Sequence, residues 1–154
     1  MAMTNKGKRD LLQHEFIRTE SLPTNYYVAL VTSSGSPGDD TNLMSDLTEV
    51  PNGNGYTSGG IQLTPGATDF DTITEDDEND RGEIKIKDLT FLATGGAIPI
   101  SGDPVHYAVL TDDNVTPASR KILDTWDLGT DIIIAENNSL VLQDLTIRLK
   151  KPAV

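Results

Sequence analysis

The chain has 154 residues, of which 36% are apolar and 5% aromatic, and it carries 12 basic and 24 acidic side chains. This length suits one domain with a buried core, and the net charge of -12 argues against nucleic acid as the main partner, because phosphate binding needs a cationic surface. The absence of cysteine excludes disulfides and thiolate metal sites, and no apolar run approaches the roughly 20 residues of a membrane helix, so no membrane partner is expected.

The first predicted element is a short helix over residues 4–18. Thr4 or Asn5 can cap it, whereas Gly7 weakens its start. Its apolar positions form a broad and weak stripe, so this helix needs tertiary support. We expect residues 1–20 to form an N-terminal arm and residues 21–154 to form a single β-sandwich domain.

The run YYVALVT at residues 26–32 predicts a strand that is covered on both faces, because it is apolar at both parities. Residues 33–60 are rich in Ser, Gly, Asp and Asn and are expected to be mostly loop, with two helical turns near residues 41–50. A loop system of this length in a compact domain usually has a role. A short strand is predicted over residues 60–64.

The second half of the chain alternates short strands with turns. The segment EIKIK alternates cleanly, and Asp88 marks a bulge or a break before Leu89 and Phe91, which have the opposite parity. Further strands are predicted over residues 105–111, 120–127, 131–135 and 139–150. The tally is about eight short strands with turn signals between them and no strand–helix–strand rhythm. The fold class is therefore all-β, as an antiparallel β-sandwich or jelly-roll with one short N-terminal helix.

Charge is unevenly distributed along this chain. Residues 1–18 contain four basic and two acidic side chains, residues 148–154 contain three basic ones, and residues 19–147 contain five basic and 22 acidic ones. Two interpretations stay open: the basic ends are simply solvated, or they dock on an acidic partner. The candidates for such a contact are Lys6, Lys8, Arg9, Lys150 and Lys151.

Residues with catalytic or ligand-binding potential are sparse. His106 lies within a predicted strand, which indicates a partly buried structural role, and His14 lies on the predicted helix. Two distant histidines do not make a zinc site, and no nucleophile elbow or phosphate-binding loop is present. Residues 77–88 match some positions of a calcium loop, but Arg81 stands where a ligand is needed and the flanks are predicted strands. We therefore expect no enzyme, no catalytic residues, no cofactor and no metal site.

Aromatic residues in loop-like contexts carry two interpretations. Tyr56, Phe70 and Trp126 either close an end of the sandwich or contact a neighbouring subunit. The acidic segment EDDEND at residues 75–80 is expected to be a solvated hairpin tip.

The chain also contains, in this order, the segments NKGKRDLL, YYVALVTS, GNGY, IKDLTFLATGG, HYAVLTDD and SLVLQDLTIRLK. This order resembles a group of small tailed-bacteriophage virion proteins. Their pattern is a helix, a YVALYT-like strand, a GGGYAR-like turn, a TFP-ATG segment, a WALYD-like strand and a last LTI-L strand. The resemblance spans residues 5–150, and the sequence departs from it at TSGG after GNGY and in the acidic EDDEND segment.

The resemblance implies a capsid decoration (cement) protein that binds the outer capsid surface and stabilises the head lattice. Such a protein would assemble in the host cytoplasm and sit on the capsid exterior, with the major capsid protein as its partner, as a homo-oligomer with a trimer favoured. The basic candidates would contact an acidic capsid surface. The alternative is a tail, baseplate or fibre subunit, structural or binding host carbohydrate through residues 33–60. A small hydrolase or lyase on a jelly-roll scaffold would need a convergent acid or histidine site that the sequence does not supply.

Overall fold

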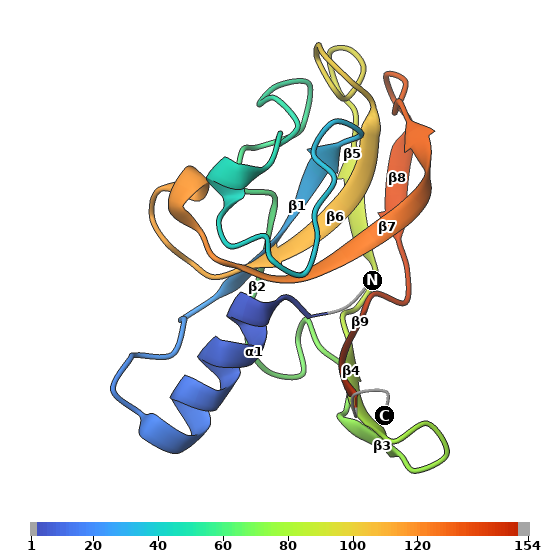
Figure 1. The fold of residues 1–154 in the computed structure, drawn as a ribbon. Helices are drawn as coiled ribbons and strands as arrows, with labels where there is room; N and C mark the ends of the chain where they lie inside the picture. Colours follow the sequence, from blue (N-terminus) through green and yellow to red (C-terminus); the bar gives the residue numbers. More distant parts are fainter. Residues whose placement is uncertain (1–2, 151–154) are drawn as a thin grey trace.

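The computed structural model describes residues 3–150. This part of the chain contains one α-helix and nine strands, and the strands form two β-layers (Figure 1). α1 (Asn5–Leu12) continues into a π-helical turn (Gln13–Ile17), and all strand pairs are antiparallel. The expected all-β fold with a short N-terminal helix is confirmed, and the arrangement is consistent with a β-sandwich. The helix projects from the strands at the lower left of Figure 1.

The first layer is a four-stranded sheet in the order β2-β1-β6-β7. Its centre is formed by β1 (Tyr26–Thr32) and β6 (Val105–Thr111), whose bounds match the predicted strands. Its edges are β2 (Ile61–Leu63) and β7 (Ile122–Ile132). The two central strands are rich in β-branched and aromatic residues, which fit a pleated surface covered by packing on both sides.

The second layer consists of two short sheets that follow each other along the chain. β5 (Leu89–Leu92) pairs with β8 (Ser139–Leu142), and β4 (Arg81–Lys85) pairs with β9 (Thr146–Lys150). β3 (Thr74–Asp76) adds to the outer edge of β4, so that the β3–β4 hairpin and β9 project at the lower right of Figure 1. β4 is followed along the chain by β5, and β8 by β9, so each pair forms one extended run with a single short interruption.

The two interruptions face each other. The break expected at Asp88 is confirmed, since β4 and β5 belong to different sheets. The single closing strand expected over residues 139–150 is instead divided, because Asp144 adopts a left-handed conformation with φ 56° between β8 and β9. The backbone N–H of Ile86 donates to the carbonyl of Leu145 at 2.8 Å and keeps the two runs together across the break.

β7 differs from the prediction in another way. The two strands expected over residues 120–127 and 131–135 form one strand with a large bulge. Tyr107 pairs with Asp127 and Val105 with Ile132, so one residue of β6 faces four residues of β7. Gly129, at φ 77°, lies within this bulge, where it takes a conformation that other residues adopt at a cost.

The main core lies between the two layers. Val28 and Leu30 of β1 point into it and are fully buried. From the second layer, Phe91 and Leu142 contribute to the same cluster. Each such side chain contributes about 1.5–3 kcal/mol through burial, so this cluster holds the layers together.

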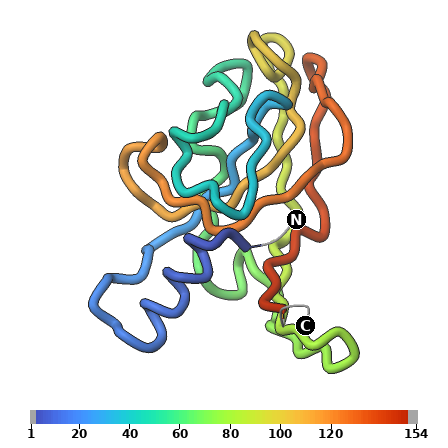
Figure 2. The backbone as a smooth tube through the Cα atoms, viewed as in Figure 1, coloured from blue at the N-terminus to red at the C-terminus, as the bar shows by residue number. Residues whose placement is uncertain are grey.

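The opposite face of the first sheet is covered by the segment 33–60. Ala29 and Val31 point to this face, where they pack against Met44, which lies in a short 3-10 turn. The segment is fixed to β1 by backbone hydrogen bonds, among them one from the N–H of Val50 to the carbonyl of Leu30 at 3.0 Å. Figure 2 shows it, in cyan to green, folded over β1. The two-sided burial predicted for β1 is therefore confirmed, and this loop system supplies the second cover.

Candidate interaction surface

The helix is held on β7 through its first residues. The hydroxyl of Thr4 accepts a hydrogen bond from the N–H of Gly7, as an N-cap does, and donates to the carbonyl of Ile122 at 2.5 Å. Gly7 lies so close to Leu123 that a Cβ at position 7 would come within 2.2 Å of the carbonyl oxygen. The residue that weakens the helix in isolation is thus the one that lets it approach the sheet.

A buried carboxylate secures the same contact. The side chain of Asp10 is 4% exposed and lies 2.8 Å from Arg9 and 3.3 Å from the ammonium group of Lys121. Burial lowers the pKa of Lys121, but Asp10 and Glu20 outweigh it, so its pKa is raised. A hydrogen bond from Arg9 lowers the pKa of Glu20. The cluster uses paired charges to join the helix, the segment after it and Lys121, the residue directly before β7.

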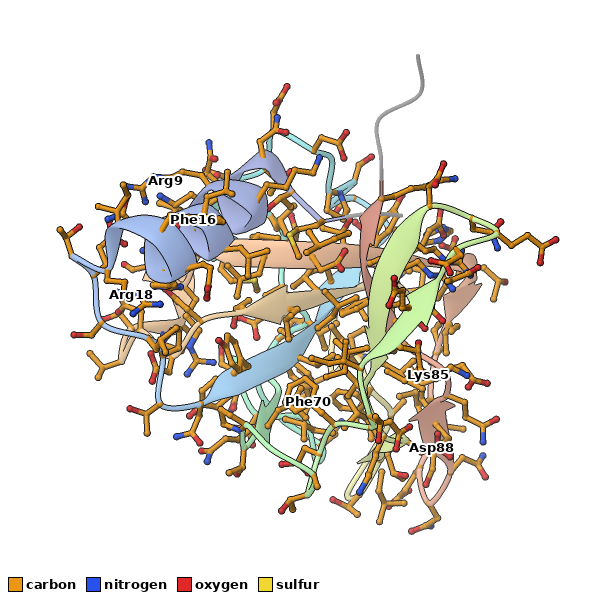
Figure 3. All side chains as sticks on the ribbon, turned by 90° about the horizontal axis from the view of Figure 1, so that it is seen from below. Arg9, Phe16, Arg18, Phe70, Lys85 and Asp88 are labelled. Carbon is orange, nitrogen blue, oxygen red and sulfur yellow. The ribbon has the colours of Figure 1, made fainter. Side chains whose placement is uncertain are left out.

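The outer face of the helical segment carries apolar side chains that nothing in the described chain covers. Leu12, Phe16 and Ile17 are 56%, 74% and 62% exposed. Figure 3 shows Phe16 on the helical segment and Arg18 directly after it, on the other side of the molecule from Lys85 and Asp88. Contiguous exposed apolar residues of this kind mark contact surfaces in soluble proteins.

A groove of about 960 Å³ adjoins this helix. It lies between α1, the segment 65–73 and the start of the second layer at β4 and β9. Its apolar lining includes Leu11, Leu22, Tyr26, Phe70, Ile73, Ile84 and Ile147. Phe70 and Tyr26 meet edge to face at 6.4 Å between their ring centroids and form part of the floor. Acidic side chains of Asp71, Asp112 and Asp113 also line it.

The basic candidates occupy two separate places. Lys6, Lys8 and Arg9 all lie on α1, whereas Lys150 ends β9 on the other side of the lower end of the molecule (Figure 1). Lys151 lies outside the described residues. Lys6 and Arg9 are engaged with Asp10, at 3.8 and 2.8 Å.

Lys8 and Lys150 differ from the other two. Both are exposed, and neither forms an ion pair within residues 3–150. Their charges are therefore open to a partner, whereas those of Lys6 and Arg9 are partly neutralised by their own molecule. The fold itself does not bring Lys8 and Lys150 together.

The two ring nitrogens of His106 contact two carboxylates of the β7 bulge. Its Nδ1 lies 2.6 Å from Asp131 and its Nε2 lies 3.2 Å from Asp127. The ring also lies against Tyr107, with centroids 4.6 Å apart. Sequence reasoning anticipated a structural histidine here, but it could not find the two aspartates, because the bulge that presents them depends on the strand register. The contacts of His106 with the two aspartates hold the bulged part of β7 against β6.

The acidic segment 75–80 lies at the tip of the β3–β4 hairpin, with Glu75 and Asp76 in β3 and residues 77–80 in the turn. Asp76 accepts hydrogen bonds from Asn79 and pairs with Arg81 at 2.9 Å. Hydrogen bonding to Asn79 lowers the pKa of Asp76. No group of three or more His, Asp or Glu side chains in the described part of the chain could hold a metal ion. The two flanks of the possible calcium loop 77–88 are the strands β3 and β5, as the sequence predicted.

The three aromatics singled out in the sequence lie inside or against the core. Tyr56 is buried, stacks on Phe91 with ring centroids 6.0 Å apart, and donates to Glu49 while accepting from the N–H of Leu30. Burial raises the pKa of Tyr56, and the charge of Glu49 raises it further. Trp126 is half-buried and its indole N–H donates to the carbonyl of Thr146 at 3.2 Å, which ties the two layers together.

One buried acid was not anticipated. Asp124 on β7 is 2% exposed, and burial raises its pKa from 3.8 to about 7. Its carboxylate accepts a hydrogen bond from the N–H of Thr125 at 2.7 Å, and Met3 bridges to β7 at this residue. The sequence offered no signal for it, because the cover comes from the N-terminal segment.

Neither the protein-family models nor the curated protein sequences with which the chain was compared match it. None of the helices described within residues 3–150 is long and apolar enough to cross a membrane.

Proposed function

We propose that the chain is a structural, non-enzymatic component of a tailed-bacteriophage virion, and within that class a capsid decoration protein. It binds the outer surface of the head, contacts the major capsid protein and stabilises the lattice. The observation that carries the proposal is that exposed apolar and cationic side chains gather at the helical end of a strongly acidic molecule. Such a surface serves binding to protein neighbours.

The order of the segments that resemble the phage proteins supports the virion part of the proposal. NKGKRDLL coincides with α1, and YYVALVT and HYAVLT fall on β1 and β6, the two central strands. GNGY forms a tight turn in which the N–H groups of Gly53 and Tyr56 each donate to the other residue's carbonyl. The remaining two segments supply β5, β8 and β9. The resemblance thus follows the framework of the fold.

Lys8 and Lys150 are the cations that fit attachment to an acidic capsid surface. Both are exposed, and their charges are not engaged by carboxylates within residues 3–150. Many copies on one particle would each contribute a weak contact, and contacts that each oligomer makes simultaneously raise its effective affinity.

The tail, baseplate or fibre alternative shares the fold and differs in copy number. Quantitative mass spectrometry of purified particles of the encoding phage, with head and tail fractions separated, tests both. A copy number comparable with that of the major capsid protein in the head fraction supports decoration. A few tens of copies in the tail fraction contradicts decoration and supports the alternative, and absence from the particles contradicts both.

The capsid contact is tested separately, by binding of the purified protein to heads that lack it. Lys8→Glu and Lys150→Glu should each weaken attachment several-fold, and the loss should shrink with added salt, because exposed charges are screened. Lys85→Glu is the matched control, since the ammonium group of Lys85 is already bound to Asp144 at 2.9 Å. Wild-type attachment of both variants would remove these two cations from the contact.

A further inference from the structure

The exposed helical face and the apolar groove lie on the same molecule but cannot satisfy each other within one chain. Leu12, Phe16 and Ile17 are exposed, and none of them lines the groove of its own chain. The wall that α1 gives to this groove comes from its other side, through Gly7, Asp10 and Leu11. One molecule therefore presents an apolar ridge and an apolar groove that remain unpaired.

The groove is open and suited to an apolar side chain. Leu22 and Ile73 lie on its sides and are 67% and 73% exposed, while Phe70 and Ile84 are partly buried deeper in the lining. Its volume of about 960 Å³ is large enough for several side chains of an inserted helical turn. If a partner covered these residues, each Å² of apolar surface removed from water would contribute about 25 cal/mol to the binding free energy.

The distribution of charge favours a second copy of this chain as the occupant of the groove. Residues 1–18 carry four basic and two acidic side chains, whereas residues 19–147 carry five basic and 22 acidic ones. The charged residues of the groove lining are Asp71, Asp112, Asp113 and Lys87, together with Lys121 and Asp10, which pair with each other at 3.3 Å, so the lining is acidic on balance. Two acidic bodies repel each other, so a contact between copies is favourable only where the basic helical segment of one meets the acidic body of the other.

We propose that the groove of one copy receives the helical end of a second copy, with Leu12, Phe16 and Ile17 in the apolar lining and Arg18 near the acidic side chains. This contact is head-to-tail, because the ridge and the groove are different surfaces of the chain. A head-to-tail contact closes into a ring or extends into a filament.

The inference deepens the proposed function, since it supplies the contact that joins copies of a decoration protein. It is tested on the isolated full-length chain without any particle. Particle copy number can therefore contradict decoration while self-association holds, and the isolated protein can stay monomeric while decoration holds.

The test is sedimentation velocity of the full-length chain over a range of concentrations. Phe16→Glu removes the ridge and Ile73→Glu blocks the groove, and each should weaken self-association by about 30-fold or more, as loss of a central apolar contact does. Both side chains are largely exposed, so the variants should keep the fold, which circular dichroism and thermal unfolding check. Val115→Glu is the matched control, because Val115 is 95% exposed and outside the groove.

Mixing the two variants gives the decisive result. Phe16→Glu keeps an intact groove and Ile73→Glu keeps an intact ridge, so an equimolar mixture should form a one-to-one complex and nothing larger. The proposal is overturned by a wild-type chain that stays monomeric, by either variant assembling like the wild type, or by a mixture that contains monomers alone. Loss of assembly in Val115→Glu would also overturn it.

Discussion

Replacing Asp124 by asparagine tests the electrostatics of the helix-covered side of β7. The carboxylate is 2% exposed and its pKa is raised to about 7, chiefly by burial. A raised pKa in the folded state means that folding favours the protonated acid. The stability that protonation supplies is complete below the ordinary pKa of 3.8 and is lost as the pH rises through about 7.

The magnitude follows from the size of the shift. Each pKa unit corresponds to about 1.36 kcal/mol, so the roughly two pH units between 5 and 7 cost the wild type about 3 kcal/mol of unfolding free energy through this group. The asparagine side chain of the variant does not ionise, and its oxygen can still accept from the N–H of Thr125. The side-chain NH2 group that the asparagine buries can lower the free energy of unfolding, but this cost is the same at every pH.

The measurement is urea unfolding of the wild type and Asp124→Asn at pH 5 and pH 8. The free energy of unfolding of the variant, relative to that of the wild type, should rise by about 3 kcal/mol between these two values. Asp103→Asn is the control, since Asp103 is exposed and should show no comparable change. The reasoning is refuted if the difference between variant and wild type is the same at both pH values.

Two further predictions concern packing at other points of the fold. Gly7→Ala raises helix propensity by about 1 kcal/mol but brings its Cβ within 2.2 Å of the carbonyl oxygen of Leu123, so thermal unfolding should show a net loss of about 2 kcal/mol. Gly38→Ala, which meets nothing within 4 Å, is its control, and a stabilised Gly7→Ala would show that the helix can shift freely on the sheet. Tyr56→Phe should lower the free energy of unfolding by about 1–3 kcal/mol, because the N–H of Leu30 and the carboxylate of Glu49 lose their shared partner. An unchanged urea midpoint would mean that solvent replaces the hydroxyl.

Much of the local structure could be predicted from the sequence. β1 and β6 have the predicted bounds, because short runs that are apolar at both parities and rich in β-branched and aromatic residues are typical of a strand covered on two sides. The break at Asp88 followed from a change of parity. The parity also changes from Leu142 to Leu145, but the apolar Val141 between Leu140 and Leu142 hides this change in the sequence. The division between β8 and β9 at Asp144, where φ turns positive, was therefore not predicted.

The candidate surface was only partly predictable. The sequence placed Lys6, Lys8 and Arg9 on a helix, but the structure shows that Lys6 and Arg9 are engaged by Asp10, a residue that gave no sign of burial. The groove could not be predicted at all, since its walls come from segments far apart in the chain.

The sequence by itself determined the all-β class, the N-terminal helix and the central strands of this protein, because these depend on the period of apolar residues within short segments. The tertiary structure alone decided how the strands pair, why a glycine lies in the helix, and where two buried aspartates and an apolar groove occur. Those features depend on distances between segments that are remote in sequence. The exposed outer face of the helix and the groove beside it, from which the proposed contacts are drawn, belong to this second group.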